Sequence, residues 1–107
     1  MKTKLIGDSE IYNKQKDLAI AIIEKFGGSI VINVDHFIDD RDKMNKEFYV
    51  NFIQIRLPDN IEVLISNDNN NIMTAEFDLR QIEENDKSQD IIYRLRALLM
   101  NNRCKIM

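Results

Sequence analysis

The chain has 107 residues, of which 44% are hydrophobic and 31% are charged, and its formal net charge is −3. This length predicts a single domain, residues 1–107, with one core, and the composition argues against a disordered tail. No apolar run approaches the roughly 18 residues that span a bilayer, and the start MKTKLIGDSE lacks the apolar centre of a signal peptide. The single cysteine cannot form an internal disulfide. We therefore predict a cytoplasmic protein without a membrane segment.

The first predicted element is a helix that ends at about residue 26. Asp8 or Ser9 can cap its start, and the pair Gly27-Gly28 is the usual left-handed stop after a helix. One face carries an apolar row made of Ile11, Leu18, Ile22 and Phe26. The run LAIAII, residues 18–23, extends the apolar surface nearly all round, so we expect burial on more than one side.

Four strands are predicted next. The first, residues 29–38, alternates, with inward candidates Ile30, Ile32, Val34 and Ile38. A polar loop over residues 39–46 separates it from a second strand over 47–57. Pro58-Asp59-Asn60 is a turn before a third strand over 61–66, and NDNNN is a turn before a fourth over 72–79. Such short connections favour an antiparallel meander.

The last predicted element is a helix. Ser88 is its expected cap, and its apolar stripe consists of Ile91, Ile92, Leu95, Leu98 and Leu99. The predicted class is therefore α+β, a four-stranded antiparallel sheet with an N-terminal and a C-terminal helix in the order α-β-β-β-β-α.

Both faces of the predicted sheet carry apolar side chains. One face collects Ile30, Ile32, Val34, Ile53, Ile55, Ile61, Val63, Ile65, Met73 and Phe77, and we expect the first helix to cover it. The other face mixes Val31, Phe37, Phe48, Val50, Phe52 and Leu64 with Asp35, Gln54, Arg56, Glu62 and Glu76. Either the last helix or another protein chain can cover this second face, and we favour another chain for at least part of it.

Charge is unevenly distributed along the chain. Residues 1–34 have a net charge of +1, residues 35–86 of −8 and residues 87–107 of +4. An acidic middle argues against general binding of nucleic acid through the sheet, because phosphates would be repelled. The chain also has 17 Ile and 12 Asn but only 4 Ala and 3 Gly, which is typical of AT-rich genomes such as those of low-GC bacteria, their phages and their plasmids.

The motifs of common catalytic and cofactor sites are missing. The only histidine, His36, lies near Asp39, Asp40 and Asp42, but this segment lacks the spacing and central glycine of an EF-hand, and zinc would need more His or Cys ligands. There is no G-x-S-x-G elbow, P-loop or dinucleotide fingerprint. Arg103 and Lys105 flank Cys104 and are expected to favour its thiolate, although a thiol so placed is usually incidental. We predict no catalytic residue, metal or cofactor.

Two alternatives rest on resemblance. Pro58-Asp59 followed by Asp78-Leu79-Arg80, with Glu24 on the first helix, resembles the Pro-Asp and (D/E)-x-K pattern of magnesium nucleases. It departs from that pattern because arginine replaces the lysine. The element order is also similar to that of double-stranded-RNA-binding domains. The basic cluster of such domains is missing, and the aligned cations are Arg96, Arg103 and Lys105.

The sequence thus favours a small non-catalytic protein that binds and regulates another protein. The hypothesis is a phage or mobile-element inhibitor of a host defence enzyme, of the anti-CRISPR kind, whose carboxylates mimic phosphates. The predicted partner-binding residues are Asp35, Asp39, Asp40, Asp42, Glu47 and Asp68. The predicted self-association residues, for a homodimer, are Phe48, Val50, Phe52 and Leu64. The alternatives are a metal-dependent nuclease-like domain and an RNA-binding domain.

Overall fold

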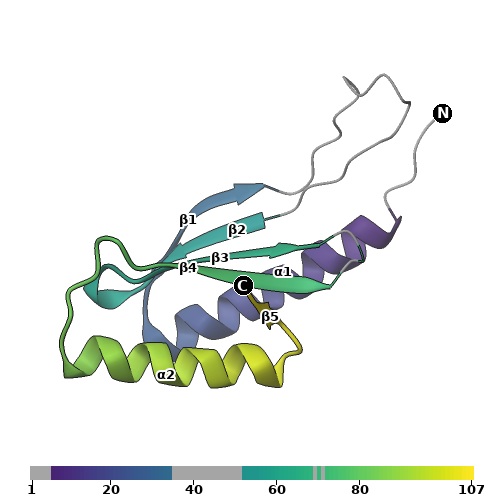
Figure 1. The fold of residues 1–107 in the computed structure, drawn as a ribbon. Coiled ribbons are helices and arrows are strands. Elements are labelled where there is room, and N and C mark those ends of the chain that lie inside the picture. The colour runs from purple at the N-terminus through teal and green to yellow at the C-terminus, as the bar shows by residue number, and fades with distance from the viewer. Residues whose placement is uncertain (1–5, 35–51, 69, 71) are drawn as a thin grey trace.

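The computed structural model describes residues 6–34, 52–68, 70 and 72–107, with side chains from residue 11 onward. In chain order the elements are α1 (Ile6–Phe26), β1 (Ser29–Val34), β2 (Phe52–Arg56), the short 3-10 turn η1 (Pro58–Asn60), β3 (Glu62–Asn67), β4 (Met73–Asp78), α2 (Asp86–Asn101) and β5 (Lys105–Ile106). The two helices lie on the same side of one sheet (Figure 1). Within the described ranges, neither helix combines the length and apolar character needed to cross a membrane.

The described residues form a sheet of five strands in the order β1-β2-β3-β4-β5. Neighbouring strands from β1 to β4 are antiparallel, whereas β5 pairs with β4 in parallel. The α+β class with one helix before and one after the four main strands is therefore confirmed. The predicted four-stranded, wholly antiparallel sheet needs correction to a five-stranded mixed sheet. The chain leaving α2 returns along the outer edge of β4, where Met107 N donates to Ala75 O at 2.8 Å.

Helix α1 ends where the glycine pair predicts but begins earlier than expected. Its first turn starts before Asp8 and Ser9, so both residues lie inside the helix and the predicted cap is wrong. The left-handed φ of 80° at Gly27 stops the helix. At Gly28 a Cβ would lie 2.5 Å from the carbonyl oxygen of Arg56, so only glycine lets α1 turn so closely against β2.

Helix α2 is capped by Asn85 rather than by Ser88. The side chain of Asn85 accepts from Ser88 N at 2.8 Å, and Asn85 N donates to Ser88 Oγ at 3.0 Å, which completes a reciprocal capping box. At the other end Arg103 takes the left-handed φ of 58° that glycine usually provides. Cys104 N then donates to Leu99 O at 2.9 Å, and the chain enters β5.

A bulge in β1 changes the predicted facing of its side chains. Ile30 pairs with Ile55, but the register shifts before Ile32, which pairs with Gln54. After the bulge, side chains therefore alternate between the two sheet faces one residue out of phase with those before it. Ile32 and Val34 lie on the face opposite to Ile30, so the prediction that all three point inward is wrong. The fourth inward candidate, Ile38, lies outside the described residues.

A single core lies between the sheet and both helices. It combines side chains of α1, α2 and the helix side of the strands, chiefly Leu18, Ile22, Ile53, Ile55, Ile61, Val63, Ile65, Ala75, Ile91, Ile92, Leu95 and Leu99. Full burial of each large apolar side chain contributes about 1.5–3 kcal/mol to folding. Because the helices share this one core, neither of them covers the second face of the sheet.

Candidate interaction surface

The strand side chains that point away from both helices form a surface that we call the open face. Cross-strand pairing places Ile32, Val34, Phe52, Gln54, Arg56, Glu62, Leu64, Glu76 and Asp78 on it. On β2, β3 and β4 the alternate residues belong to the core, and on β1 Ile32 and Val34 pair with Gln54 and Phe52. No helix in the described part of the chain packs on this face. From the sequence, either the last helix or another chain could cover the open face. The structure shows that the last helix, α2, does not cover it.

Apolar side chains occupy the β1 end of the open face. Val34 pairs with Phe52, and Ile32 and Leu64 flank Gln54 on its two sides. Ile32 is exposed, whereas Val34, Phe52 and Leu64 are half-buried. These four residues are called here the apolar strip; Val34 and Phe52 are direct cross-strand partners, and Gln54 lies between Ile32 and Leu64.

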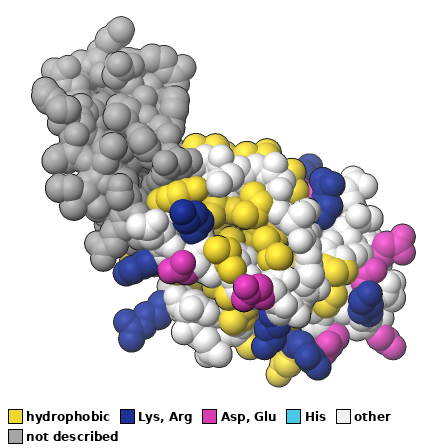
Figure 2. All heavy atoms as spheres, turned by 180° about the vertical axis from the view of Figure 1, so that it is seen from behind, with side chains coloured by type: hydrophobic (Ala, Val, Ile, Leu, Met, Phe, Trp, Pro, Cys, Tyr) yellow, Lys and Arg dark blue, Asp and Glu magenta, His cyan; other side chains and the backbone are white. Residues whose placement is uncertain are grey.

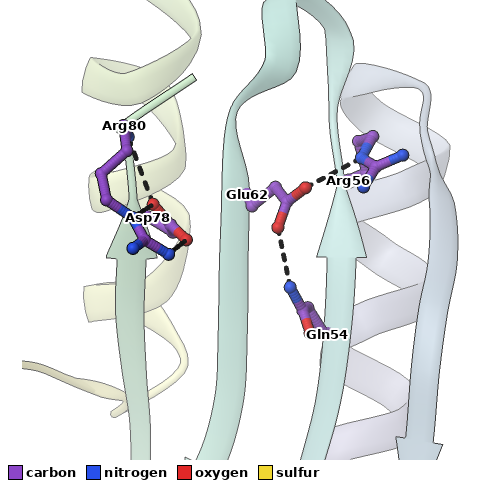
Figure 3. A network of polar contacts seen from close by, with 5 residues as sticks. All are labelled: Gln54, Arg56, Glu62, Asp78 and Arg80. Carbon is purple, nitrogen blue, oxygen red and sulfur yellow. Dashed lines mark hydrogen bonds and ion pairs between the residues drawn. The ribbon is translucent and has the colours of Figure 1, made fainter. Parts of the chain in front are cut away.

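A polar network borders the apolar strip (Figure 3). Glu62 at the start of β3 accepts from Gln54 Nε2 at 2.7 Å and from Arg56 Nε at 2.9 Å. Arg56 and Glu62 are direct cross-strand partners on either side of η1. The turn predicted at residues 58–60 is the sequence signal for this pairing, because it places Arg56 opposite Glu62. The carboxylate is thereby fixed in position.

A second ion pair lies beside the first, at the end of β4 (Figure 3). Arg80 donates to both oxygens of Asp78, with Nη2 to Oδ2 at 2.8 Å and Nε to Oδ1 at 3.0 Å. The backbone N of Arg80 also donates to Oδ1 at 3.2 Å. These hydrogen bonds, the side-chain ones foremost, lower the pKa of Asp78 to about 2. Asp78 is thus held ionised and already partnered.

An open hollow of about 410 Å³ lies over this polar end of the face, lined by Gln54, Glu62, Leu64, Glu76, Asp78 and Arg80 among others. Glu62 and Asp78 are compensated by arginines. Glu76 is exposed and has no ion pair within the described residues. Among the described residues, the hollow therefore holds one carboxylate without an ion pair, next to two ion pairs and Leu64 of the apolar strip.

Most of the predicted partner-binding residues, Asp35, Asp39, Asp40, Asp42 and Glu47, lie outside the described residues, as does His36. Asp68 is described, at the end of β3. Its Oδ1 accepts from Ile72 N at 3.0 Å and from Asn70 N at 2.8 Å, and these bonds lower its pKa. The carboxylate of Asp68 thus shapes the turn between β3 and β4.

Two of the predicted self-association residues, Phe48 and Val50, also lie outside the described residues. The structure places the other two, Phe52 and Leu64, together on the open face, within the apolar strip. Phe37 and Phe48, the other aromatic residues expected on this face, are not described.

The residues of the nuclease-like pattern do not converge. Pro58 and Asp59 form η1, where Asp59 has a left-handed φ of 63°. Glu24 is exposed on α1, on the helix side of the sheet, whereas Asp78 points to the open side and is bound by Arg80. Among the described residues, no group of three or more His, Cys, Asp or Glu is placed to hold a metal ion.

The cations of the RNA-binding alternative come from three consecutive segments. The Arg96 guanidinium on α2 lies over the ring of Phe77, 5.4 Å from its centroid. Arg103 follows α2 with its left-handed φ, and Lys105 belongs to β5.

Cys104 is buried in the core, not exposed near the surface. Burial raises the pKa of its thiol to about 11, so the expected effect of Arg103 and Lys105 is wrong in direction. A thiol in this state is a packing residue.

Comparisons with protein-family models, with curated proteins and with solved structures found no match.

Proposed function

We propose that this chain is a non-catalytic protein-binding domain whose partner covers the open face. One observation carries the proposal: both helices pack on the same side of the sheet, and the apolar strip on the other side has no cover within the described residues. An apolar group bordered by polar side chains is the usual composition of a protein interface.

The polar border supports recognition rather than catalysis. Glu62 and Asp78 are each held by an arginine, so these carboxylates need little reordering when a partner arrives. Glu76 adds a carboxylate that has no ion pair in the described part of the chain. A partner with an apolar patch next to a lysine or arginine would match this arrangement in both shape and charge.

The narrower proposal concerns the partner. The net charge of −8 over residues 35–86 favours a basic groove on a host defence protein, where the carboxylates compete with nucleic acid. On this proposal the domain is a phage or mobile-element inhibitor. Its binding weakens as the salt concentration rises, because exposed charges are screened.

The test begins with identification of the partner by pull-down and mass spectrometry, followed by calorimetry with both purified proteins. We expect Leu64→Lys to weaken binding by about tenfold or more, because it places a charge in the apolar strip. Tyr93→Lys is the matched control, since Tyr93 is exposed on α2, and we expect it to bind as the wild type does. Equal affinity of both variants and the wild type would exclude the open face.

A further pair of variants separates the narrower proposal from the broader one. Reversal of Asp39 and Asp40 to lysine removes acidic charge and changes none of the open-face residues named above. We expect this variant to lose affinity and salt dependence together if phosphate mimicry operates. If the Asp39/Asp40 variant keeps both its affinity and its salt dependence while Leu64→Lys loses binding, phosphate mimicry is rejected and the open face remains the interaction surface.

A further inference from the structure

We infer that β1 is a self-pairing edge, through which two copies of the chain join their sheets in an antiparallel, two-fold arrangement. β1 is the first strand of the sheet and pairs on one side only, with β2, among the described residues. Such an edge strand carries backbone N–H and C=O groups that are free to pair with another strand.

The composition of this edge is the first argument. Soluble proteins usually protect an edge strand with lysine, proline, another charge or a β-bulge. β1 has a bulge, but its six residues, SIVINV, include no lysine, no proline and no charge. Three consecutive β-branched side chains are exposed, Ile30 by 41%, Val31 by 42% and Ile32 by 45%. Exposed β-branched residues on an uncharged edge favour addition of a further strand.

The bulge in β1 is the second argument. Because the register shifts between Ile30 and Ile32, one isoleucine faces the helix side of the sheet and the other faces the open side. An incoming strand therefore meets an apolar side chain above and below the backbone. Without the bulge both isoleucines would lie on the same face, and the other face of this edge would be less apolar.

Helix α1 extends the apolar surface below the edge. Tyr12 on α1 donates its hydroxyl to Asn33 Oδ1 of β1 at 2.7 Å, which shows that this flank of the helix borders β1. In the rear view of Figure 2 hydrophobic side chains gather at the surface between scattered charges. The candidate contact thus includes two layers, strand and helix.

The lack of charge on β1 removes the repulsion that a second copy would otherwise meet at this edge. Across a two-fold axis every edge residue meets the same strand of the other copy, so any charge there faces its own sign. β1 has no charge to repel its copy. A standard interface uses roughly 20–30 residues from each partner. One strand and one helix flank provide fewer residues than this, so we expect a weak dimer whose population relative to the monomer rises with concentration.

This inference is independent of the proposed function. Pairing at β1 uses the sheet edge and the flank of α1, whereas the proposed partner covers the open face. Two joined sheets would present two open faces side by side. Loss of the dimer therefore need not abolish partner binding, and the variants named for each surface differ.

The test is sedimentation velocity of the full chain over a concentration series. We expect the wild type to move from monomer to dimer, and Ile30→Lys to raise the dimer dissociation constant by about tenfold or more, because each copy then carries a charge on the shared edge. Ile30 lies on the helix side of β1 and is not part of the apolar strip. Ile72→Lys is the matched control: Ile72 is 45% exposed, close to the 41% of Ile30, but lies before β4, and we expect its variant to dimerise as the wild type does. Amide hydrogen exchange in β1 should slow as concentration rises.

Several outcomes overturn the inference. A wild type that stays monomeric at its highest soluble concentration has no self-pairing edge. A dimer that forms equally well with Ile30→Lys is built on another surface. A monomeric wild type whose identified partner loses affinity for Ile30→Lys assigns the edge to a foreign strand instead. Far-UV circular dichroism confirms that each variant is folded before its mass is compared.

Discussion

Glu62 and Asp78 stand directly opposite each other on β3 and β4, and a different arginine binds each carboxylate. Like charges at directly opposite positions destabilise a sheet. Arg56 on the neighbouring strand β2 forms an ion pair with Glu62, and Arg80, two residues after Asp78, forms an ion pair with Asp78. The polar end of the open face is therefore a set of two ion pairs placed side by side, and its order depends on both arginines.

The first prediction concerns the ionisation of Asp78. Arg80→Gln removes the side-chain hydrogen bonds that are the largest cause of its low pKa, so we expect that pKa to rise from about 2 toward the ordinary value of about 3.9. Carboxyl-carbon NMR over an acid titration measures it. Arg94→Gln is the control, because Arg94 pairs with Asp90 on α2 at 3.0 Å, and it should leave the Asp78 titration unchanged.

The same pair makes stability depend on pH in a defined direction. The folded pKa of Asp78 lies below the unfolded value, so its contribution is present above about pH 4 and is lost as the pH falls through about 2. Urea midpoints of the wild type should therefore fall more steeply over this window than those of Arg80→Gln. Parallel curves for the two proteins would mean that the ion pair does not affect folding.

The sequence was sufficient for those features that follow from local spacing. The stop at Gly27, the four main strands and the apolar stripe of α2 all depend on residues that lie close together in the chain. The hairpin at residues 58–60 belongs to the same class, and it determines the Arg56–Glu62 pairing on the open face. Local rules of this kind apply before any tertiary contact forms.

Three other features depend on long-range contacts and were missed for that reason. Period-two alternation predicts facing only without a bulge, and the bulge in β1 becomes visible only once β2 is paired. The stripe of α2 shows that the helix is buried but not against which sheet face. β5 has only two residues, Lys105 and Ile106, so it has no periodic signal and exists because α2 ends beside β4.

The second prediction concerns the capping box that replaced the predicted Ser88 cap. Asn85→Ala removes the acceptor for Ser88 N, and we expect a loss of about 1 kcal/mol in the free energy of unfolding. Asn13→Ala is the control. Asn13 is exposed within α1, where alanine has the higher helix propensity, so this variant should be neutral or slightly more stable. Urea denaturation measures both. An equal change in the two variants would contradict the assigned cap.

The last prediction concerns Gln15, the only large polar side chain that is fully buried among the described residues. Its Nε2 donates to Asn67 Oδ1 at 3.2 Å, but its Oε1 has no hydrogen-bond partner. An unpaired buried acceptor costs about 1–3 kcal/mol, whereas one ordinary hydrogen bond contributes about 0.5–1.5 kcal/mol. Gln15 therefore destabilises the core on balance.

Gln15→Met keeps the length of the side chain and removes both polar groups, so we expect the free energy of unfolding to increase by about 1 kcal/mol. Asn67 is only half-buried, so water can replace its lost donor. Gln89→Met, at an exposed site on α2, should change stability by less than about 0.5 kcal/mol. If urea denaturation shows Gln15→Met to be less stable than the wild type, the bond to Asn67 outweighs the unpaired oxygen, and Gln15 links α1 to the end of β3.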